Sequence, residues 1–487
     1  MLYEKENTRE MLLRAIAEYK EAMRLDRETS TIYKQIALVY FRLGKYNKAI
    51  KSLDHALALS PKQENLYTIK GLLLTDMHNY AQAIKTYEKH LALKPDSTET
   101  MFVLGSLYAK INNFDSAILY YDKVLEKEPE NTDVFFNKGL IYMYQKKYAL
   151  AVNSFNTLLK YKPDNVLARY NLAVIAEAQN KTDEAIFQIK EILKTNPDNY
   201  EMKKELGVLY YEQGDTTAAL QTFKELINKG AYIENSRLYS AKIYEINEQY
   251  DSAVALYKSI LSADPAFSDA YIHLGYIYGY KNNIQKSLMY FKKALDLSPD
   301  DAKLNAFVGL AYSTLKKYDK ALKFLLKAVK LDPNNTVYLM NVGVVYDKKG
   351  DDAKALKFLK KAYNIDSTNS DLNNYLGYLL IEQGQDLNFA ISIIKQALTS
   401  DPTNGYYLDS LGWGYFKLNK MDKAKEYLEK AVKYVDDDPV ILEHLGDWHF
   451  SQGDKTAAIK LWKKSLALEN SNKEHLLQKI NEAEKQQ

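Results

Sequence analysis

One pattern of small, large and apolar residues repeats along almost the whole chain with a period of 34 residues. Eight prolines mark this period in two runs, Pro61, Pro95, Pro129, Pro163 and Pro197, and then Pro265, Pro299 and Pro333. A fixed period of this length predicts a stack of similar helical units, each of which contacts only its neighbours. A stack grows by adding units, so the 487 residues do not require several globular domains.

Residues 302–335 show one unit clearly. Small and apolar residues stand at Phe307, Val308, Gly309, Ala311 and Tyr312, and after a polar turn at 316–319 apolar residues recur at helical spacing, at Ala321, Leu322, Leu325, Ala328 and Val329. Asp332-Pro333 ends the second run, because proline lacks an amide hydrogen and clashes with the preceding turn. Each unit is therefore predicted to be a pair of amphipathic helices.

Each predicted first helix has a small residue where it crosses its partner closely. Glycine stands there in ten repeats and alanine in three, at Gly71, Gly105, Gly139, Gly207, Gly275, Gly309, Gly343, Gly377, Gly412 and Gly446, and at Ala37, Ala173 and Ala241. In most repeats a tyrosine follows three positions later, and we expect this ring to fill the space beside the small residue. The second helices have alanine at the matching position, with Ser287 as the one departure. Most of the 41 tyrosines are thus predicted to be core residues.

Composition excludes several classes of function. The chain has no cysteine, which excludes disulfides, thiolate nucleophiles and cysteine-ligated metals. With 66 lysines and arginines against 63 aspartates and glutamates the net charge is +3, so the global basic excess of a nucleic-acid binder is missing. There is no apolar run long enough to span a membrane, and no glycine-rich phosphate loop, GxSxG elbow or HExxH helix. We therefore expect a protein that is not an enzyme and carries no cofactor.

The two ends differ from the repeats between them. Residues 1–29 match only the second half of a unit, which predicts a capping helix or a repeat cut in two. Thirteen full repeats are predicted over 30–472 as one continuous array. Residues 473–487 keep Leu476, Leu477 and Ile480 on one face and predict a helix that shields the last repeat from water. The start lacks the apolar stretch of a signal peptide, so any membrane association is expected to come from an N-terminal anchor absent from this sequence.

In its 34-residue period and in the positions of its small, aromatic and apolar residues, the chain resembles the tetratricopeptide repeat (TPR) family. This resemblance implies an all-α fold, a solenoid of helix-turn-helix repeats wound into a right-handed superhelix. In that family the second, fifth, sixth, ninth, twelfth and thirteenth residues of each first helix line the concave surface, where peptides or partner helices bind.

Those concave positions give the candidate binding residues. In the C-terminal half they are Tyr276, Tyr280, Phe307, Asn341, Tyr375, Tyr378, Tyr406, Trp413 and Phe416, and in the N-terminal half Asn137 and Asn171. Aromatic rings with interspersed amides suit an extended peptide, because rigid rings offer contact area at low entropy cost. The alternative for each ring is packing between neighbouring repeats. For the two asparagines, hydrogen bonding to a peptide backbone is the predicted role.

Three other features were weighed as sites. Family members that bind the C-terminal carboxylate of chaperones have asparagine where this chain has Leu38 and Ile69, so the role of a cochaperone is disfavoured. The lysines of 316–330 lie largely on one second helix and predict a solvated convex face rather than an anion site. His444 and His449 are five residues apart, about 140° around a helix axis, which predicts no shared metal.

The last hundred residues, including the stretch from Leu408 to Trp413 and Trp462, look like the C-terminal repeats of bacterial envelope-associated TPR proteins, often lipoproteins. We therefore predict a scaffold that binds a protein or peptide partner in its concave groove and supports assembly of a larger complex. The periplasm or outer membrane is favoured over the cytoplasm. Two alternatives stay open: a glycan-binding envelope protein, and the regulatory arm of an enzyme carried on another chain. Self-association is a further option for the partner.

Overall fold

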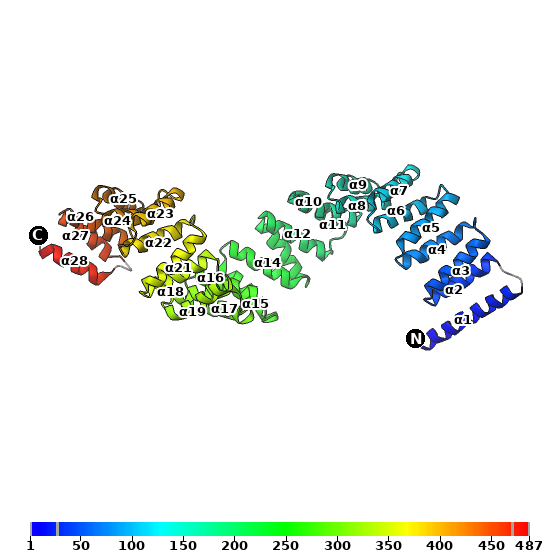
Figure 1. Cartoon of the computed structure of the whole chain (residues 1–487), viewed down its shortest axis with the longest axis horizontal. Coiled ribbons are helices and arrows are strands. Elements are labelled where there is room, and N and C mark those ends of the chain that lie inside the picture. The colour runs from blue at the N-terminus through cyan, green and yellow to red at the C-terminus, as the bar shows by residue number, and fades with distance from the viewer. Residues whose placement is uncertain (1, 26–28, 469–471, 486–487) are drawn as a thin grey trace. The chain divides into compact units, whose positions relative to one another are not determined.

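The computed structural model describes residues 2–25, 29–468 and 472–485 of the chain. These residues form 28 α-helices and no β-strand (Figure 1). The prediction of an all-α solenoid is confirmed. Residues 26–28, in the predicted N-terminal half repeat, residues 469–471, at the predicted end of the array, and residues 486–487, at the end of the predicted capping helix, lie outside the described ranges. The division into a half repeat, one continuous array and a capping helix stays a prediction.

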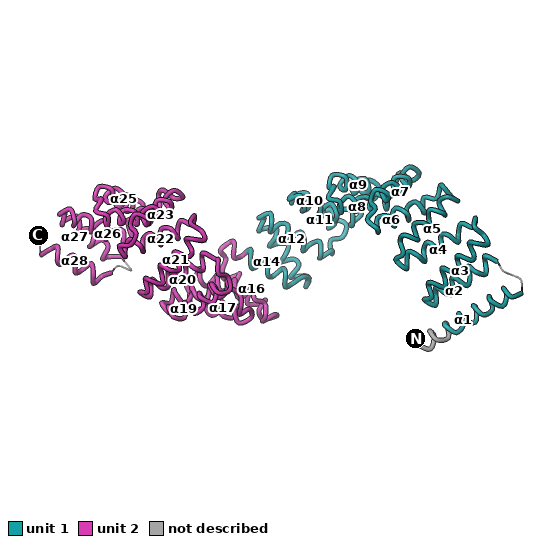
Figure 2. The backbone as a smooth tube through the Cα atoms, viewed as in Figure 1, with its two compact units in different colours: residues 1–243 teal, residues 244–487 magenta. Residues whose placement is uncertain are grey.

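The chain falls into two compact units, residues 1–243 and 244–487 (Figure 2). Unit 1 holds α1 (Leu2–Arg24), α2 (Ser30–Arg42), α3 (Tyr46–Leu59), α4 (Glu64–Asp76), α5 (Tyr80–Leu93), α6 (Thr98–Lys110), α7 (Phe114–Lys127), α8 (Thr132–Tyr144), α9 (Tyr148–Tyr161), α10 (Val166–Ala178), α11 (Thr182–Thr195), α12 (Tyr200–Gln213) and α13 (Thr216–Asn228). The boundary falls within α14 (Ile233–Ile246).

Unit 2 holds the remaining helices. They are α15 (Tyr250–Ala263), α16 (Ser268–Tyr280), α17 (Ile284–Leu297), α18 (Ala302–Thr314), α19 (Tyr318–Leu331), α20 (Thr336–Lys348), α21 (Asp352–Ile365), α22 (Ser370–Glu382), α23 (Leu387–Ser400), α24 (Gly405–Lys417), α25 (Met421–Tyr434), α26 (Pro439–Ser451), α27 (Lys455–Leu466) and α28 (Lys473–Lys485). The first helices keep the period of the sequence. From α2 at Ser30 to α22 at Ser370 they begin 34 residues apart, except that α14 begins one residue early, at Ile233.

The turn inside each repeat contains a residue in the left-handed backbone region. These residues keep the 34-residue spacing, at Gly44, His78, Asn112, Lys146, Asn180, Gly214, Glu248, Asn282, Lys316, Gly350, Gly384, Asn419 and Gly453. Between Gly384 and Asn419 the spacing grows to 35, where Asp386 adds a second positive φ of 42°. Glycine and asparagine tolerate this conformation best. The turn geometry therefore reproduces the sequence period repeat by repeat, including its one inserted residue.

Side-chain caps start many of the first helices. Asn165 Oδ1 accepts a hydrogen bond from the amide of Ala168 at 2.8 Å, and Asn369 Oδ1 does the same for Leu372 at 2.9 Å. Such a cap satisfies an amide that has no partner within the helix. The proline that precedes several of these caps ends the second helix, so a short link can stop one helix and start the next.

The small residues of the first helices let a large side chain from the second helix lie against the backbone. A Cβ atom at Gly71 would come within 2.5 Å of the Tyr87 ring, and one at Gly275 within 2.5 Å of the Phe291 ring. The expectation that the tyrosine three positions later fills this space is therefore wrong. That tyrosine is half-buried in most repeats and in several packs face to face with a ring of the second helix, as Tyr312 does with Phe324 at 5.7 Å.

The alanines at the matching position of the second helices, one in each except α17, are all fully buried, as the close crossing requires. At the one departure, Ser287 is buried and its hydroxyl donates a hydrogen bond to the Gly275 carbonyl oxygen at 2.7 Å. The buried hydroxyl of Ser287 thus has a hydrogen-bond acceptor on the first helix, which compensates for the loss of its contact with water.

Helix α28 packs its buried residues Leu476, Ile480 and Ala483 against the last repeat. The prediction for Leu477 is wrong, since 47% of that residue is exposed. Leu477 lies next to Leu476 along the helix, about 100° further around the axis, so it turns towards solvent when its neighbour packs.

Replacement of Gly309 by leucine should destabilise unit 2. A Cβ atom there would come within 2.6 Å of Leu325 and 3.1 Å of the Ala321 carbonyl oxygen, so the paired helices must move apart. We expect a loss of about 1 to 3 kcal/mol, read from urea unfolding followed by circular dichroism. A G309L variant with the unfolding midpoint of the parent chain would contradict the close crossing.

Candidate functional site

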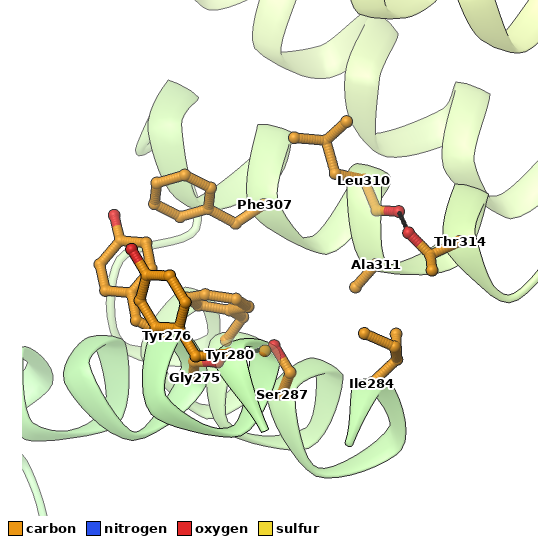
Figure 3. Close-up of a pocket in the computed structure, with 11 residues that line it drawn as sticks. Gly275, Tyr276, Tyr280, Ile284, Ser287, Phe307, Leu310, Ala311 and Thr314 are labelled. Carbon is orange, nitrogen blue, oxygen red and sulfur yellow. Dashed lines mark hydrogen bonds between the residues drawn. The ribbon is translucent and has the colours of Figure 1, made fainter. Parts of the chain in front are cut away.

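An apolar pocket opens between the first helices α16 and α18 of unit 2, with α17 as its floor (Figure 3). Its volume is about 390 Å³. The lining residues are Gly275, Tyr276, Gly279, Tyr280, Ile284, Ser287, Phe291, Phe307, Leu310, Ala311 and Thr314. No lysine, arginine, aspartate or glutamate is among them, so the pocket offers an apolar wall with hydroxyl groups as its polar atoms.

Gly279 creates the space for this pocket. It stands at the twelfth position of its first helix, where the other repeats carry a side chain. A Cβ atom at Gly279 would meet only the Ser287 hydroxyl, at 3.6 Å, which is ordinary contact. Packing therefore does not require glycine here, in contrast to Gly275 one helical turn earlier. Glycine is a poorer helix former than alanine, and here it stands in the last turn of α16, where a side chain would enter the pocket.

Three aromatic rings form one wall of the pocket. Tyr276 lies edge-on to Phe291 at 5.4 Å and to Phe307 at 5.1 Å between ring centroids, and Phe291 stacks with Phe307 at 5.0 Å. These contacts hold the rings in place, so the wall exists before any ligand arrives. The predicted site residues Tyr276 and Phe307 are thus brought together.

Tyr280 stands at the mouth of the pocket and is 75% exposed. Its ring lies over Tyr250 at 6.2 Å with nearly parallel planes. Leu310 and Thr314 of α18 face it across the opening in Figure 3. An exposed ring beside a concave apolar wall is what an interaction site presents to a partner.

The other predicted aromatic residues of the C-terminal half lie in the repeats that follow, outside this pocket. Tyr375 and Tyr378 of α22 and Phe416 of α24 are half-buried, and the Tyr375 hydroxyl donates a hydrogen bond to Asp347 at 2.6 Å. Tyr406 of α24 is exposed. Tyr378 and Phe416 join one cluster of rings with His444 and Trp413: the Tyr378 centroid lies 6.3 Å from that of His444, and the Phe416 centroid 4.9 Å from that of Trp413.

Trp413 is only 7% exposed. Its ring stacks on His444 at 4.0 Å and on Phe416 at 4.9 Å, and its indole nitrogen donates to Glu382. Phe416 lies on α24 like Trp413 itself, but His444 belongs to the next first helix, α26. The ring therefore joins two repeats, which is the packing alternative for the predicted aromatic residues.

The three predicted asparagines lie on three different first helices, α8, α10 and α20. Asn137, Asn171 and Asn341 are all half-buried. The Asn171 amide donates a hydrogen bond to the Leu167 carbonyl oxygen of its own helix at 2.8 Å, which occupies a donor that a peptide backbone would need. Their role in peptide binding stays a prediction.

His444 and Asp409 form a buried ion pair between α26 and α24. His444 Nδ1 lies 2.9 Å from Asp409 Oδ2, and both residues are less than a tenth exposed. Burial by itself lowers the pKa of His444, but the carboxylate of Asp409, with further help from Asp447 and Glu382, raises it above the usual value. The pair therefore links two first helices through a charge interaction shielded from solvent.

Several residues of the pocket were missed by sequence reasoning. Ile284, Leu310 and Thr314 line it, but only aromatic and asparagine side chains at concave positions were predicted as site residues. Gly279 is not among the predicted site residues either. The signal that could have found it is the missing side chain at a position filled in the other twelve repeats.

Neither a metal nor a membrane span is indicated in the part of the chain that the structure describes. No group of three or more His, Cys, Asp or Glu side chains there is arranged to hold a metal ion. No described helix is both long enough and apolar enough to cross a membrane. His449 pairs with Asp454 at 3.3 Å instead of approaching His444.

The paired helices and concave pocket define a helical-repeat protein of the α-solenoid class. Family models described as tetratricopeptide repeat match residues 74–135, 136–189, 176–231, 268–301, 302–335 and 331–473. A model described as anaphase-promoting complex, cyclosome, subunit 3 matches residues 12–90. The chain belongs to the tetratricopeptide repeat family, whose members are in general scaffolds for protein–protein interaction.

Solved structures similar to the chain include other repeat proteins. A tetratricopeptide repeat protein from Parabacteroides merdae ATCC 43184 is 18% identical, over 54% of this chain and 99% of that chain, with a TM-score of 0.43. The APC/C hetero-tetramer Cut9-Hcn1 matches at 15% identity over 99% and 94%, with a TM-score of 0.44. Yeast Tom70 matches at 18% identity over 94% and 95%, with a TM-score of 0.34. No curated protein matches the chain.

The ion pair predicts how the stability of the C-terminal repeats depends on pH. Because the folded pKa of His444 is raised, the pair contributes its full stability below the unfolded pKa of about 6.5 and loses it as pH rises through the folded value. H444Q should therefore flatten the decline in stability above neutral pH. All three tryptophans lie in this part of the chain, so their fluorescence during urea unfolding reports it.

The control for this measurement is H55Q, which removes a histidine in unit 1 and should leave the fluorescence transition unchanged at every pH. A wild-type chain whose tryptophan transition does not move between weakly acidic and alkaline pH would contradict the role of the pair.

Proposed function

We propose that this chain is a non-enzymatic scaffold that binds a peptide segment of a protein partner on the concave side of unit 2. The observation that carries the proposal is the pocket opened by Gly279. Its preformed aromatic wall and uncharged lining suit one bulky apolar side chain of the partner. A buried apolar side chain at the centre of an interface is a common source of binding energy.

The lining also favours a peptide over the glycan alternative. Sugars need hydrogen-bond partners for their hydroxyls as well as a ring to stack on, because unpaired polar groups are costly to bury. The lining contains no carboxylate or amide side chain, and two of its hydroxyls are already engaged, Ser287 with the Gly275 carbonyl and Thr314 with the Leu310 carbonyl. The pocket is therefore better suited to hydrocarbon than to sugar.

Assembly of a larger complex is the wider role that we propose for this binding. Repeats that already hold their contacts in fixed positions need little ordering when a partner binds, so the partner bears most of the ordering cost and several weak contacts add up. A place in the bacterial envelope is supported by the likeness of the C-terminal repeats to envelope-associated members of the family, and the role of an enzyme's regulatory arm has no supporting residue in the described ranges.

Replacement of Gly279 by leucine should abolish binding without harming the fold. A Cβ atom at this position meets only the Ser287 hydroxyl, at ordinary contact distance, and leucine is a better helix former than glycine, so we expect the free energy of unfolding to stay about equal. Peptides selected from a random display library on the full chain supply the ligand. We expect their affinity for G279L, measured by isothermal titration calorimetry, to fall by more than about tenfold, which is about 1.4 kcal/mol.

The matched control is S313L, which adds the same side chain at the same position of the next first helix, outside the pocket lining. S313L should bind the selected peptides nearly as the parent chain does. Peptides that bind G279L and the parent equally, or a library that yields no binder, would refute the pocket as the anchor of a peptide.

A further inference from the structure

Two concave carboxylates in unit 2 lack a cationic partner within residues 2–25, 29–468 and 472–485. Asp347 of α20 accepts the hydrogen bond from the Tyr375 hydroxyl at 2.6 Å. Glu382 of α22 accepts one from the indole nitrogen of Trp413. Asp347 is half-buried and Glu382 is exposed, so both can meet a partner. Each hydrogen bond fixes the position of its carboxylate, but neither neutralises its charge.

The concave carboxylates nearer the C-terminus are all paired. Asp409 has His444, and Lys479 of α28 places its ammonium group 2.7 Å from both Glu443 Oε1 and Asp447 Oδ2. Asp409, Glu443 and Asp447 thus have ion-pair partners, whereas Asp347 of α20 and Glu382 of α22 have none among the residues that the structure describes. The free charges lie in the two repeats that directly follow the pocket in the chain.

The pKa of Tyr378, at a concave position of α22, indicates the same excess of negative charge. The pKa of Tyr378 is raised above its usual range, first by burial and then by four carboxylates, those of Glu382, Asp409, Asp347 and Glu443. Nearby negative charge disfavours the phenolate, and no cation offsets it among the causes of this shift.

The rim of the pocket is affected in the same direction. Burial is the largest cause that raises the pKa of Tyr276, followed by Tyr280 and the carboxylates of Glu245 and Asp301. Lys303 of α18 lies with its ammonium group 5.6 Å from the centre of the Phe307 ring. Two carboxylates therefore lie near the Tyr276 ring, and the Lys303 ammonium group lies over the Phe307 ring. The face of an aromatic ring attracts a positive charge.

We propose that the segment bound by unit 2 is basic: it carries one bulky apolar side chain for the pocket and a lysine or arginine for Asp347 and Glu382. This rests on the function proposed above. The apolar side chain enters the uncharged pocket, and the cation pairs with carboxylates already held in place by Tyr375 and Trp413. Arginine fits best, because its planar guanidinium can bind carboxylates through two parallel hydrogen bonds.

The fold sets the spacing of the two side chains along the ligand. Neighbouring packed helices lie about 8 to 10 Å apart, so α20 and α22 lie one or two helix spacings beyond the pocket, about 10 to 20 Å. An extended peptide advances about 3.3 Å per residue. The basic residue therefore stands about three to six positions from the apolar one.

The test uses the peptides selected on the full chain and the double variant D347N/E382Q. Asparagine and glutamine still accept the hydrogen bonds from Tyr375 and Trp413, so only the charge is removed. The control D296N/D352N removes two exposed acidic charges from second helices. We expect the selected peptides to pair an apolar residue with a lysine or arginine at the stated spacing. Their affinity should fall about tenfold for D347N/E382Q, remain unchanged for the control, and weaken as salt is added.

The outcomes separate this inference from the function on which it rests. Peptides that lose binding to G279L but contain no enriched basic residue, and bind D347N/E382Q as tightly as the parent chain, would overturn the basic segment and leave the pocket standing. Selected peptides that bind G279L normally would overturn the pocket itself. Enrichment of acidic peptides would also refute the inference, because Lys303 would then be the recognising charge.

Discussion

The contact between a first-helix glycine and a large side chain of its partner helix, in the ten repeats that have this glycine, supports the rest of the structure. Where Tyr87 or Phe291 lies against the glycine backbone, the two helices approach closely enough to bury the alanines between them. The second helix supplies the large side chain and the first supplies the space, so each repeat is complete in itself. The concave positions of the first helices take no part in this contact and can vary.

The pocket is a local departure from this regularity. Gly275 and Gly279 lie one turn apart on α16, yet only Gly275 has a side chain pressed against it. The first is small because the partner helix requires it, and the second is small although nothing in the fold requires it. A repeat protein can change one concave position with little effect on its neighbours, because each unit contacts only the adjacent ones. This independence allows one repeat to hold a binding cavity within an otherwise uniform stack.

Charge distribution adds a second level of organisation to unit 2. Histidine and lysine side chains neutralise the carboxylates of α24 and α26, and the helix α28 supplies one of these cations from beyond the last repeat. The carboxylates of α20 and α22 are held by hydrogen bonds from Tyr375 and Trp413 without being neutralised. Trp413, predicted as a binding residue, thus acts on the groove through the carboxylate that it positions, while its own ring is covered by His444 and Phe416.

The sequence by itself determined the helix pairs, their register and the family, because a period of 34 residues leaves one regular way to bury every apolar face. It also placed Tyr276, Tyr280 and Phe307 among the candidate binding residues. Only the tertiary structure decided which rings are open to a partner and which are covered, since the exposure of Trp413 or Tyr280 depends on how the next first helix packs. The cavity at Gly279 was likewise decided there. The missing side chain can be seen in the sequence, but it becomes a pocket only when the surrounding rings fail to fill the space.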